Sequence, residues 1–130
     1  MIEILLVDDD ALMRELLAEW LREAGYRVRQ AGDGTTALEM LRSQPASLLI
    51  TDMDMPGRDG PQILDDARRM LPALPVIAIS GGSRDAKQNW AATALALGAS
   101  QALAKPFGRK DLLAAVAQAV PPHNAGAMRV

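Results

Sequence analysis

The chain has 130 residues, of which 49% are apolar and 23% are charged, and its formal net charge is −2. This length and composition are typical of one soluble globular domain with a single packed core. The small negative charge provides no broad positive field for a nucleic-acid backbone or an anionic membrane surface, so we expect neither as a direct ligand. The absence of cysteine excludes disulfides, thiolate metal ligands and a cysteine nucleophile.

Short apolar runs alternate with longer helical patterns along the chain, which is typical of βαβ units that build a parallel sheet. The apolar run 4–7 predicts a strand buried on both faces, and apolar residues at helical spacing over 12–24 predict a helix that ends at Gly25. In chain order, the pattern then predicts a strand at 26–30, a helix at about 34–42, a strand at 48–51, a helix at about 60–71, a strand at 76–79, a helix at about 85–97, a strand at 102–104 and a helix at 111–120. No apolar run approaches the roughly 18 residues that a membrane span requires, so we expect a cytoplasmic protein.

The end of the chain differs from the rest in composition. Pro121 and Pro122 cannot continue the last helix, and small or polar residues follow them. We therefore expect one domain over residues 1–120 and a flexible tail over residues 121–130. Because the chain begins with Met1 and the tail is short, we expect a stand-alone domain, although the two prolines would also suit a linker in a longer protein.

Polar side chains follow four of the predicted strands at the point where each strand ends. Asp8 and Asp9 follow the first strand, and Asp52 follows the third. Ser80 follows the fourth strand and Lys105 follows the fifth. In open parallel sheets, ligands bind beyond the carboxyl ends of the strands, so we expect these side chains to converge on one site.

Clustered carboxylates repel one another and must either bind a proton or share a cation, and Mg²⁺ is the ion that suits them best, with Mn²⁺ as a substitute. A carboxylate beside Mg²⁺ can attack a phosphoryl group, and Asp52 is the candidate nucleophile. Lys105 and Ser80 would supply a cation and a hydroxyl donor, and Gly81 a backbone amide that faces the phosphoryl group, although a plain turn explains the glycine equally well. An acid after a strand can also simply cap the next helix, and we favour that interpretation for Asp10.

Four segments contain the residues of the expected site, and they are Val7-Asp8-Asp9-Asp10, Thr51-Asp52-Met53-Asp54-Met55-Pro56-Gly57-Arg58-Asp59-Gly60, Ile79-Ser80 and Lys105-Pro106-Phe107. Together they resemble the signatures of the receiver domain of bacterial response regulators. The resemblance extends from Ile2 to about Val120. It implies an α/β fold of the doubly wound, flavodoxin-like (βα)5 type. The expected sheet has five parallel strands in the order 2-1-3-4-5, with helices on both faces.

The resemblance also implies a phosphoryl acceptor and its metal site. Asp52 would take a phosphoryl group from a histidine kinase or a histidine phosphotransfer protein, and the phosphorylated domain would act on an effector protein. Asp9, Asp52 and the backbone carbonyl of Asp54 would bind Mg²⁺, with Asp8 assisting through water. Such a domain is a signalling protein and not an enzyme, beyond its own phosphorylation and slow autodephosphorylation, and we expect a monomer or a weak phosphorylation-dependent homodimer.

The resemblance assigns further residues to the phosphorylated state, with one departure. Ser80 would donate its hydroxyl to the phosphoryl group, Lys105 would pair with it, and the Lys105–Pro106 bond is expected to be cis. The family often has an aromatic residue three positions before the lysine, where this chain has Ala102. Because the aromatic half of the usual switch is missing, a signal would have to pass through Ser80, the segment that follows it or another element.

Three alternatives compete with a stand-alone phosphorylated receiver. Ala102 suggests a protein-binding module on a receiver fold whose partner affinity does not depend on phosphorylation. The chain would also fit a receiver excised from a longer regulator or a hybrid kinase. A Mg²⁺-dependent phosphohydrolase of another α/β family is the third alternative, but the sequence offers it neither a substrate pocket nor a dedicated second acid.

Overall fold

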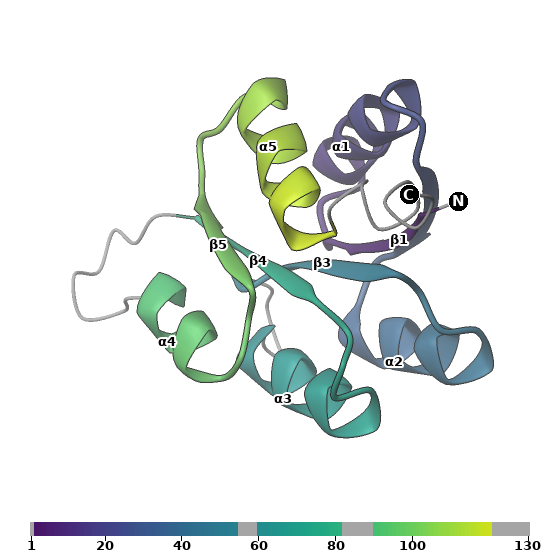
Figure 1. Ribbon diagram of the computed structural model, residues 1–130, viewed down its shortest axis with the longest axis vertical. Helices are drawn as coiled ribbons and strands as arrows, with labels where there is room; N and C mark the ends of the chain where they lie inside the picture. Colours follow the sequence, from purple (N-terminus) through teal and green to yellow (C-terminus); the bar gives the residue numbers. More distant parts are fainter. Residues whose placement is uncertain (1, 55–59, 82–89, 121–130) are drawn as a thin grey trace, which may run out of the picture.

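The computed structural model describes residues 2–54, 60–81 and 90–120. Figure 1 shows a single sheet that is covered by helices on both faces. The elements are β1 (Glu3–Val7), α1 (Ala11–Glu23), β2 (Arg27–Ala31), α2 (Gly34–Ser43), β3 (Leu48–Asp52), α3 (Gly60–Met70), β4 (Val76–Ser80), α4 (Trp90–Ala96), β5 (Gln101–Ala104) and α5 (Arg109–Ala119). The order of strands and helices is the predicted one. Residues 85–89 of the predicted fourth helix, and the predicted tail at 121–130, lie outside the described residues.

The strands are parallel and lie in the order β2-β1-β3-β4-β5, as the resemblance implied. The order reverses between β1 and β3, because β2 pairs with one edge of β1 and β3 pairs with the other. The register places Val7 beside Thr51 and Asp52 beside Ile79, so the carboxyl ends of the three central strands are neighbours. A ligand crevice is expected outside the sheet at this reversal.

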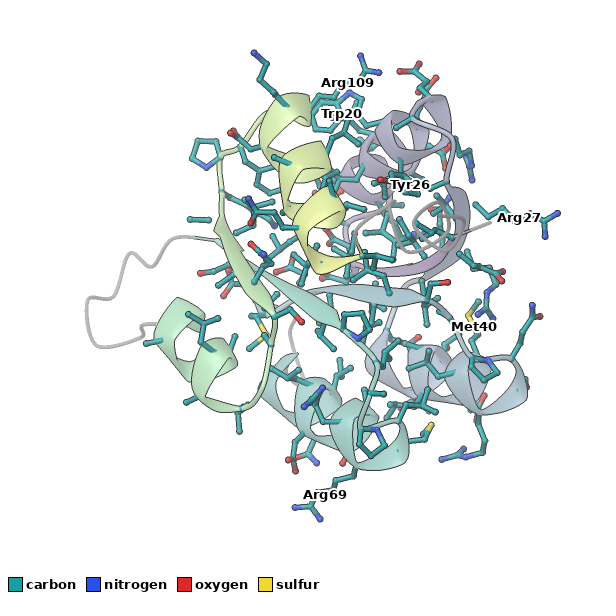
Figure 2. All side chains as sticks on the ribbon, in the orientation of Figure 1. Trp20, Tyr26, Arg27, Met40, Arg69 and Arg109 are labelled. Carbon is teal, nitrogen blue, oxygen red and sulfur yellow. The ribbon has the colours of Figure 1, made fainter. Side chains whose placement is uncertain are left out.

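The core consists of one apolar cluster on each face of the sheet. Helices α1 and α5 cover one face, and α2, α3 and α4 cover the other (Figure 1). Strands β3 and β4 are buried along their whole length, and β1 is buried from Ile4 onward. Trp20 of α1, which is labelled in Figure 2, packs against the apolar cluster beneath α1 and α5. Since each buried Leu or Ile contributes about 1.5–3 kcal/mol, these central strands give the site a firm support.

Strand β2 begins one residue later than the pattern predicted. The backbone amide of Tyr26 donates to the carbonyl of Leu21 at 3.1 Å, so Tyr26 still belongs to the turn that ends α1. The pairing with β1 starts at the next residue, where the amide of Arg27 donates to the carbonyl of Ile2 at 3.0 Å. The sequence shows the apolar and aromatic character of this segment but not which carbonyl each amide reaches.

Side chains cap the starts of helices, among them α1 and α5. Asp10 is the N-cap of α1, and its carboxylate accepts from two backbone amides of the first turn at 3.1 and 3.2 Å, which confirms the capping interpretation. Helix α5 begins at Arg109, earlier than predicted, because the Asp111 carboxylate accepts from the Gly108 amide at 3.1 Å. Among the described residues, no helix has the length and apolar character needed to cross a membrane.

Candidate functional site

Three carboxylates meet at the carboxyl edge of the sheet. Asp8 and Asp9 follow β1 and Asp52 ends β3, and one oxygen of each lies within 4.8 Å of the others. The side chains of Asp8 and Asp52 are buried, whereas Asp9 is exposed. Burying carboxylates together is unfavourable unless a proton or a cation offsets their charge. The structure therefore brings together the acids that the strand ends predicted, in an arrangement that fits a divalent cation.

Lys105 supplies a fixed positive charge to this cluster. Its Nζ donates to Oδ2 of Asp52 at 3.0 Å, and its backbone amide donates to the carbonyl of Ser80 at 2.7 Å. Burial disfavours the charged form of Lys105, but the hydrogen bond and the negative charge of Asp52 outweigh it and raise the pKa of Lys105 above its ordinary value. The ammonium therefore stays charged beside Asp52. The Lys105–Pro106 bond is cis, as the resemblance implied.

Asp8 is the carboxylate that most needs a cation. Its Oδ1 accepts from the Asp10 amide at 2.9 Å, whereas its Oδ2 is buried and has no hydrogen-bond partner within the described residues. Burial raises the pKa of Asp8 from 3.8 to about 6, against the Asp10 hydrogen bond and with a contribution from the charge of Asp52. A hard divalent ion, or water bound to it, satisfies an unpartnered carboxylate oxygen. The donor set of the site thus fits Mg²⁺.

We predict that Asp8→Asn stabilises the metal-free protein at neutral pH. The pKa of Asp8 is higher in the folded chain, about 6, than the ordinary value of 3.8. The folded state therefore binds more protons, and stability is lost as the pH rises toward and through 6. At 1.36 kcal/mol per pKa unit the loss is at most roughly 3 kcal/mol, and we expect about 1–2 kcal/mol after solvent screening.

Urea unfolding in a chelator at pH 4.5 and pH 7.5 measures this effect. The variant should be more stable than the parent at pH 7.5 and should lack the parent's loss of stability between the two pH values. Glu19→Gln, which removes an exposed acid from α1, is the control for net charge and should behave like the parent. An Asp8→Asn protein that is less stable than the parent at pH 7.5 would contradict the prediction.

The backbone amide of Gly81 has a partner that the sequence did not predict. Gly81 follows Ser80, the buried last residue of β4, and its amide donates to Oδ2 of Asp54. The amide of Asp54 in turn donates to Oδ1 of Asp52 at 2.9 Å. A Cβ on residue 81 would come too close to the end of the Asp54 side chain, so a larger residue there would displace the Asp54 carboxylate. The amide that was expected to face a phosphoryl group thus binds another anion in this state of the protein.

An apolar cavity lies beside Lys105. Its volume is about 170 Å³, and α1 and the segment after β5 supply its lining residues, which are Met13, Leu16, Leu17, Trp20, Lys105, Pro106 and Phe107. Leu12 is 85% exposed and Leu16 is 42% exposed, so the apolar surface continues outward along α1. The helical repeat in the sequence includes both leucines, but a repeat does not show which of its residues face solvent. A cavity of about 320 Å³ at the opposite edge of the sheet has no titratable residue in its lining.

Comparison with known proteins identifies the family. The model of the response regulator receiver domain matches residues 4–117. The chain is 37% identical over 115 residues to the response regulator receiver protein CpdR of Brucella abortus. The matched region covers 85% of this chain and 89% of CpdR. It is also 37% identical over 115 residues to the transcriptional regulatory protein GltR of Pseudomonas aeruginosa. That matched region covers 87% of this chain and 46% of GltR. The chain thus spans about half the length of that relative.

Solved structures give the same result. The receiver domain of NtrX from Brucella abortus superposes with a TM-score of 0.84 at 32% identity, over 92% of this chain and 98% of that one. Receiver domains bind Mg²⁺ in an acidic pocket, and in this chain Asp8, Asp9 and Asp52 form such a group. The proteins that resemble this chain are signalling regulators rather than conventional enzymes. From the family match, the relatives and the shared fold together, we conclude that the chain belongs to the response regulator receiver domain family of bacterial two-component systems.

Proposed function

We propose that this receiver accepts a phosphoryl group on Asp52 in a Mg²⁺-dependent reaction, with a histidine kinase or a histidine phosphotransfer protein as the donor. The position of the Asp52 carboxylate carries the proposal: it lies 3.0 Å from Nζ of Lys105 and within 4.8 Å of the carboxylates of Asp8 and Asp9. Phosphoryl transfer to an aspartate needs a nucleophilic carboxylate, a fixed cation and ligands for a hard divalent ion. These side chains would supply each of those parts.

Four residues would hold the metal. Asp9, Asp52 and the backbone carbonyl of Asp54 would contact Mg²⁺ directly, and Asp8 would contact it through a bound water. Such a water would also give the buried Oδ2 of Asp8 the partner that it lacks among the described residues. When bound, Mg²⁺ would neutralise negative charge on the phosphoryl oxygens.

In the proposed reaction, a carboxylate oxygen of Asp52 attacks the phosphorus atom in line with the P–N bond of a phosphohistidine. The P–N bond breaks, its electron pair stays on the imidazole nitrogen, and Asp52 becomes an acyl phosphate. The Asp54 amide already holds Oδ1 of Asp52 at 2.9 Å, which restrains the carboxylate before the donor arrives. Lys105 would then move its ammonium group to the new phosphoryl oxygens, and Ser80 would donate its hydroxyl.

The contact between Asp54 and Gly81 supports a conformational response. A phosphoryl oxygen could bind the Gly81 amide only after the Asp54 carboxylate has left it. Phosphorylation would thereby favour one arrangement of these segments over another, which is the condition for a signal. Ala102 lacks the aromatic side chain of the usual switch. The replacement of the Asp54 carboxylate by a phosphoryl oxygen at the Gly81 amide is therefore our candidate for the first step of the conformational response.

The donor protein would dock on the apolar surface of α1. Leu12 and Leu16 are exposed there, one helical turn apart, and Leu16 lines the cavity that Phe107 and Lys105 also line beside Asp52. Single exposed leucines are ordinary on protein surfaces. Their grouping with a cavity next to the reacting carboxylate favours a partner that inserts an apolar side chain, as helices do in apolar grooves.

Intact mass after incubation with acetyl phosphate tests the acceptor function. With Mg²⁺ we expect the gain of one phosphoryl group, and with a chelator we expect none. The second candidate function, a phosphorylation-independent binding module, rests on Ala102. Failure of acetyl phosphate and of a panel of phosphorylated histidine kinases to label the chain would contradict the first proposal and favour the second.

A further inference from the structure

Arg14 connects α1 to the strand end that carries two of the site carboxylates. Its Nη1 donates to the backbone carbonyl of Asp8 at 2.7 Å, and its Nε donates to Oε1 of Gln30 in β2 at 3.0 Å. Nε2 of Gln30 donates in turn to Oε1 of Glu15 at 3.1 Å. A guanidinium is a planar fork of donors, so two bonds from different sides fix its orientation. Arg14 therefore joins the ends of β1 and β2 to the first turns of the helix.

The segment that Arg14 holds carries two of three carboxylates that repel one another. Asp8, Asp9 and Asp52 place three carboxylate oxygens within 4.8 Å of one another, and like charges at this distance repel. Lys105 forms its ion pair with Asp52, not with the two acids that follow β1. Because the Asp9 side chain is exposed, the position of its carboxylate depends mainly on the position of the Asp9 backbone. Repulsion in the metal-free site thus acts to push this backbone away from β3.

We propose that Arg14 is a positioning residue that holds the backbone of Asp8 and Asp9 in the geometry required for Mg²⁺ binding. This inference rests on the metal site of the proposed function. Arg14 acts through the carbonyl of Asp8 and does not bind the metal itself. Residues that orient metal ligands in this way typically change metal affinity by about 10–100-fold when they are replaced.

The identity of the metal separates positioning from general support of the fold. Mg²⁺ requires nearly ideal octahedral geometry, whereas Ca²⁺ accepts longer bonds and variable coordination. A loosened backbone at Asp8 and Asp9 should therefore weaken Mg²⁺ more than Ca²⁺. A general loss of structure should weaken both ions alike.

Calorimetric titration of the full chain with Mg²⁺ and separately with Ca²⁺ tests the inference. For Arg14→Met we expect Mg²⁺ affinity to fall about tenfold or more, with a clearly smaller loss for Ca²⁺. Arg14→Lys should be intermediate, because one ammonium can reach the Asp8 carbonyl but does not reproduce the fork to Gln30. Arg69→Met, on α3 with an exposed side chain that pairs with Asp65, is the control and should leave both affinities unchanged.

Three results would overturn the inference. They are an unchanged Mg²⁺ affinity in Arg14→Met, an equal loss for both ions, and an Arg14→Lys variant no better than Arg14→Met. If Arg14→Met does not fold, Gln30→Leu removes one of the two restraints on the guanidinium and should lower Mg²⁺ affinity selectively, and an unchanged ratio there would equally refute the role. A parent chain that binds no Mg²⁺ would refute the proposed metal site itself, whereas normal parent binding with an indifferent Arg14 would refute only this inference.

Discussion

Asp52→Asn is expected to take up no phosphoryl group under conditions that label the parent chain with one. The amide that replaces the carboxylate is a poor nucleophile, and Lys105 loses the anion that it contacts at 3.0 Å. The variant also has one metal-ligating carboxylate fewer, so its Mg²⁺ affinity should fall as well. Intact mass spectrometry after incubation with acetyl phosphate and Mg²⁺ measures the labelling directly.

A matched control separates loss of the acceptor from loss of an acid. Asp66→Asn makes the same chemical change on α3, where Asp66 contacts Gln62, and it should be labelled like the parent. Urea unfolding of each variant shows whether a loss of labelling is confined to the site or follows from a loss of stability. Labelling of Asp52→Asn at the parental rate and stoichiometry would move the acceptor to another carboxylate, such as Asp8 or Asp9 in the same cluster.

Leu12→Asp is expected to slow transfer from a phosphorylated protein donor about tenfold or more, while labelling by acetyl phosphate stays unchanged. A minority of interface residues cost more than about 1 kcal/mol when they are truncated, and at Leu12 the added charge would also oppose burial of this surface by a partner. The substitution should be tolerated by the fold, because Leu12 is 85% exposed. The measurement is the rate of transfer from a purified, autophosphorylated histidine kinase that labels the parent.

Leu95→Asp provides the comparison for this docking surface. Leu95 is also an exposed leucine, at 51%, but it lies on α4 and not beside the carboxylate cluster. It should therefore leave transfer from the kinase unaffected. Equal slowing by both substitutions would indicate a general effect of the new charge and would remove the support for docking on α1. Slowing of acetyl phosphate labelling by Leu12→Asp would place its effect in the reaction rather than in recognition.

The sequence predicted the strands and the position of the acids because both follow from local patterns, whereas the order of the strands was implied by the family resemblance. Short buried strands appear as apolar runs, and the residue that ends each run must lie at the carboxyl edge, which located Asp52 and Lys105. The contacts of Arg14 were not predictable in this way. They depend on the guanidinium reaching the Asp8 carbonyl after β1 and the Gln30 side chain in β2. The partner of the Gly81 amide was missed for the same reason, because Asp54 and Gly81 become neighbours only when β3 and β4 pair.

The burial of β3 over its whole length also determines how the site can be observed without any label. Backbone amides in such a strand exchange with deuterium only when the protein opens globally, so their exchange rates report the stability of the entire domain. A ligand that binds only the native state lowers the population of the open state, and the slowing increases with its concentration relative to the dissociation constant. The amide of Ile50, buried in the middle of β3, should therefore exchange more slowly as Mg²⁺ is added. Deuterium exchange in the centre of the sheet would thus measure occupancy at its edge.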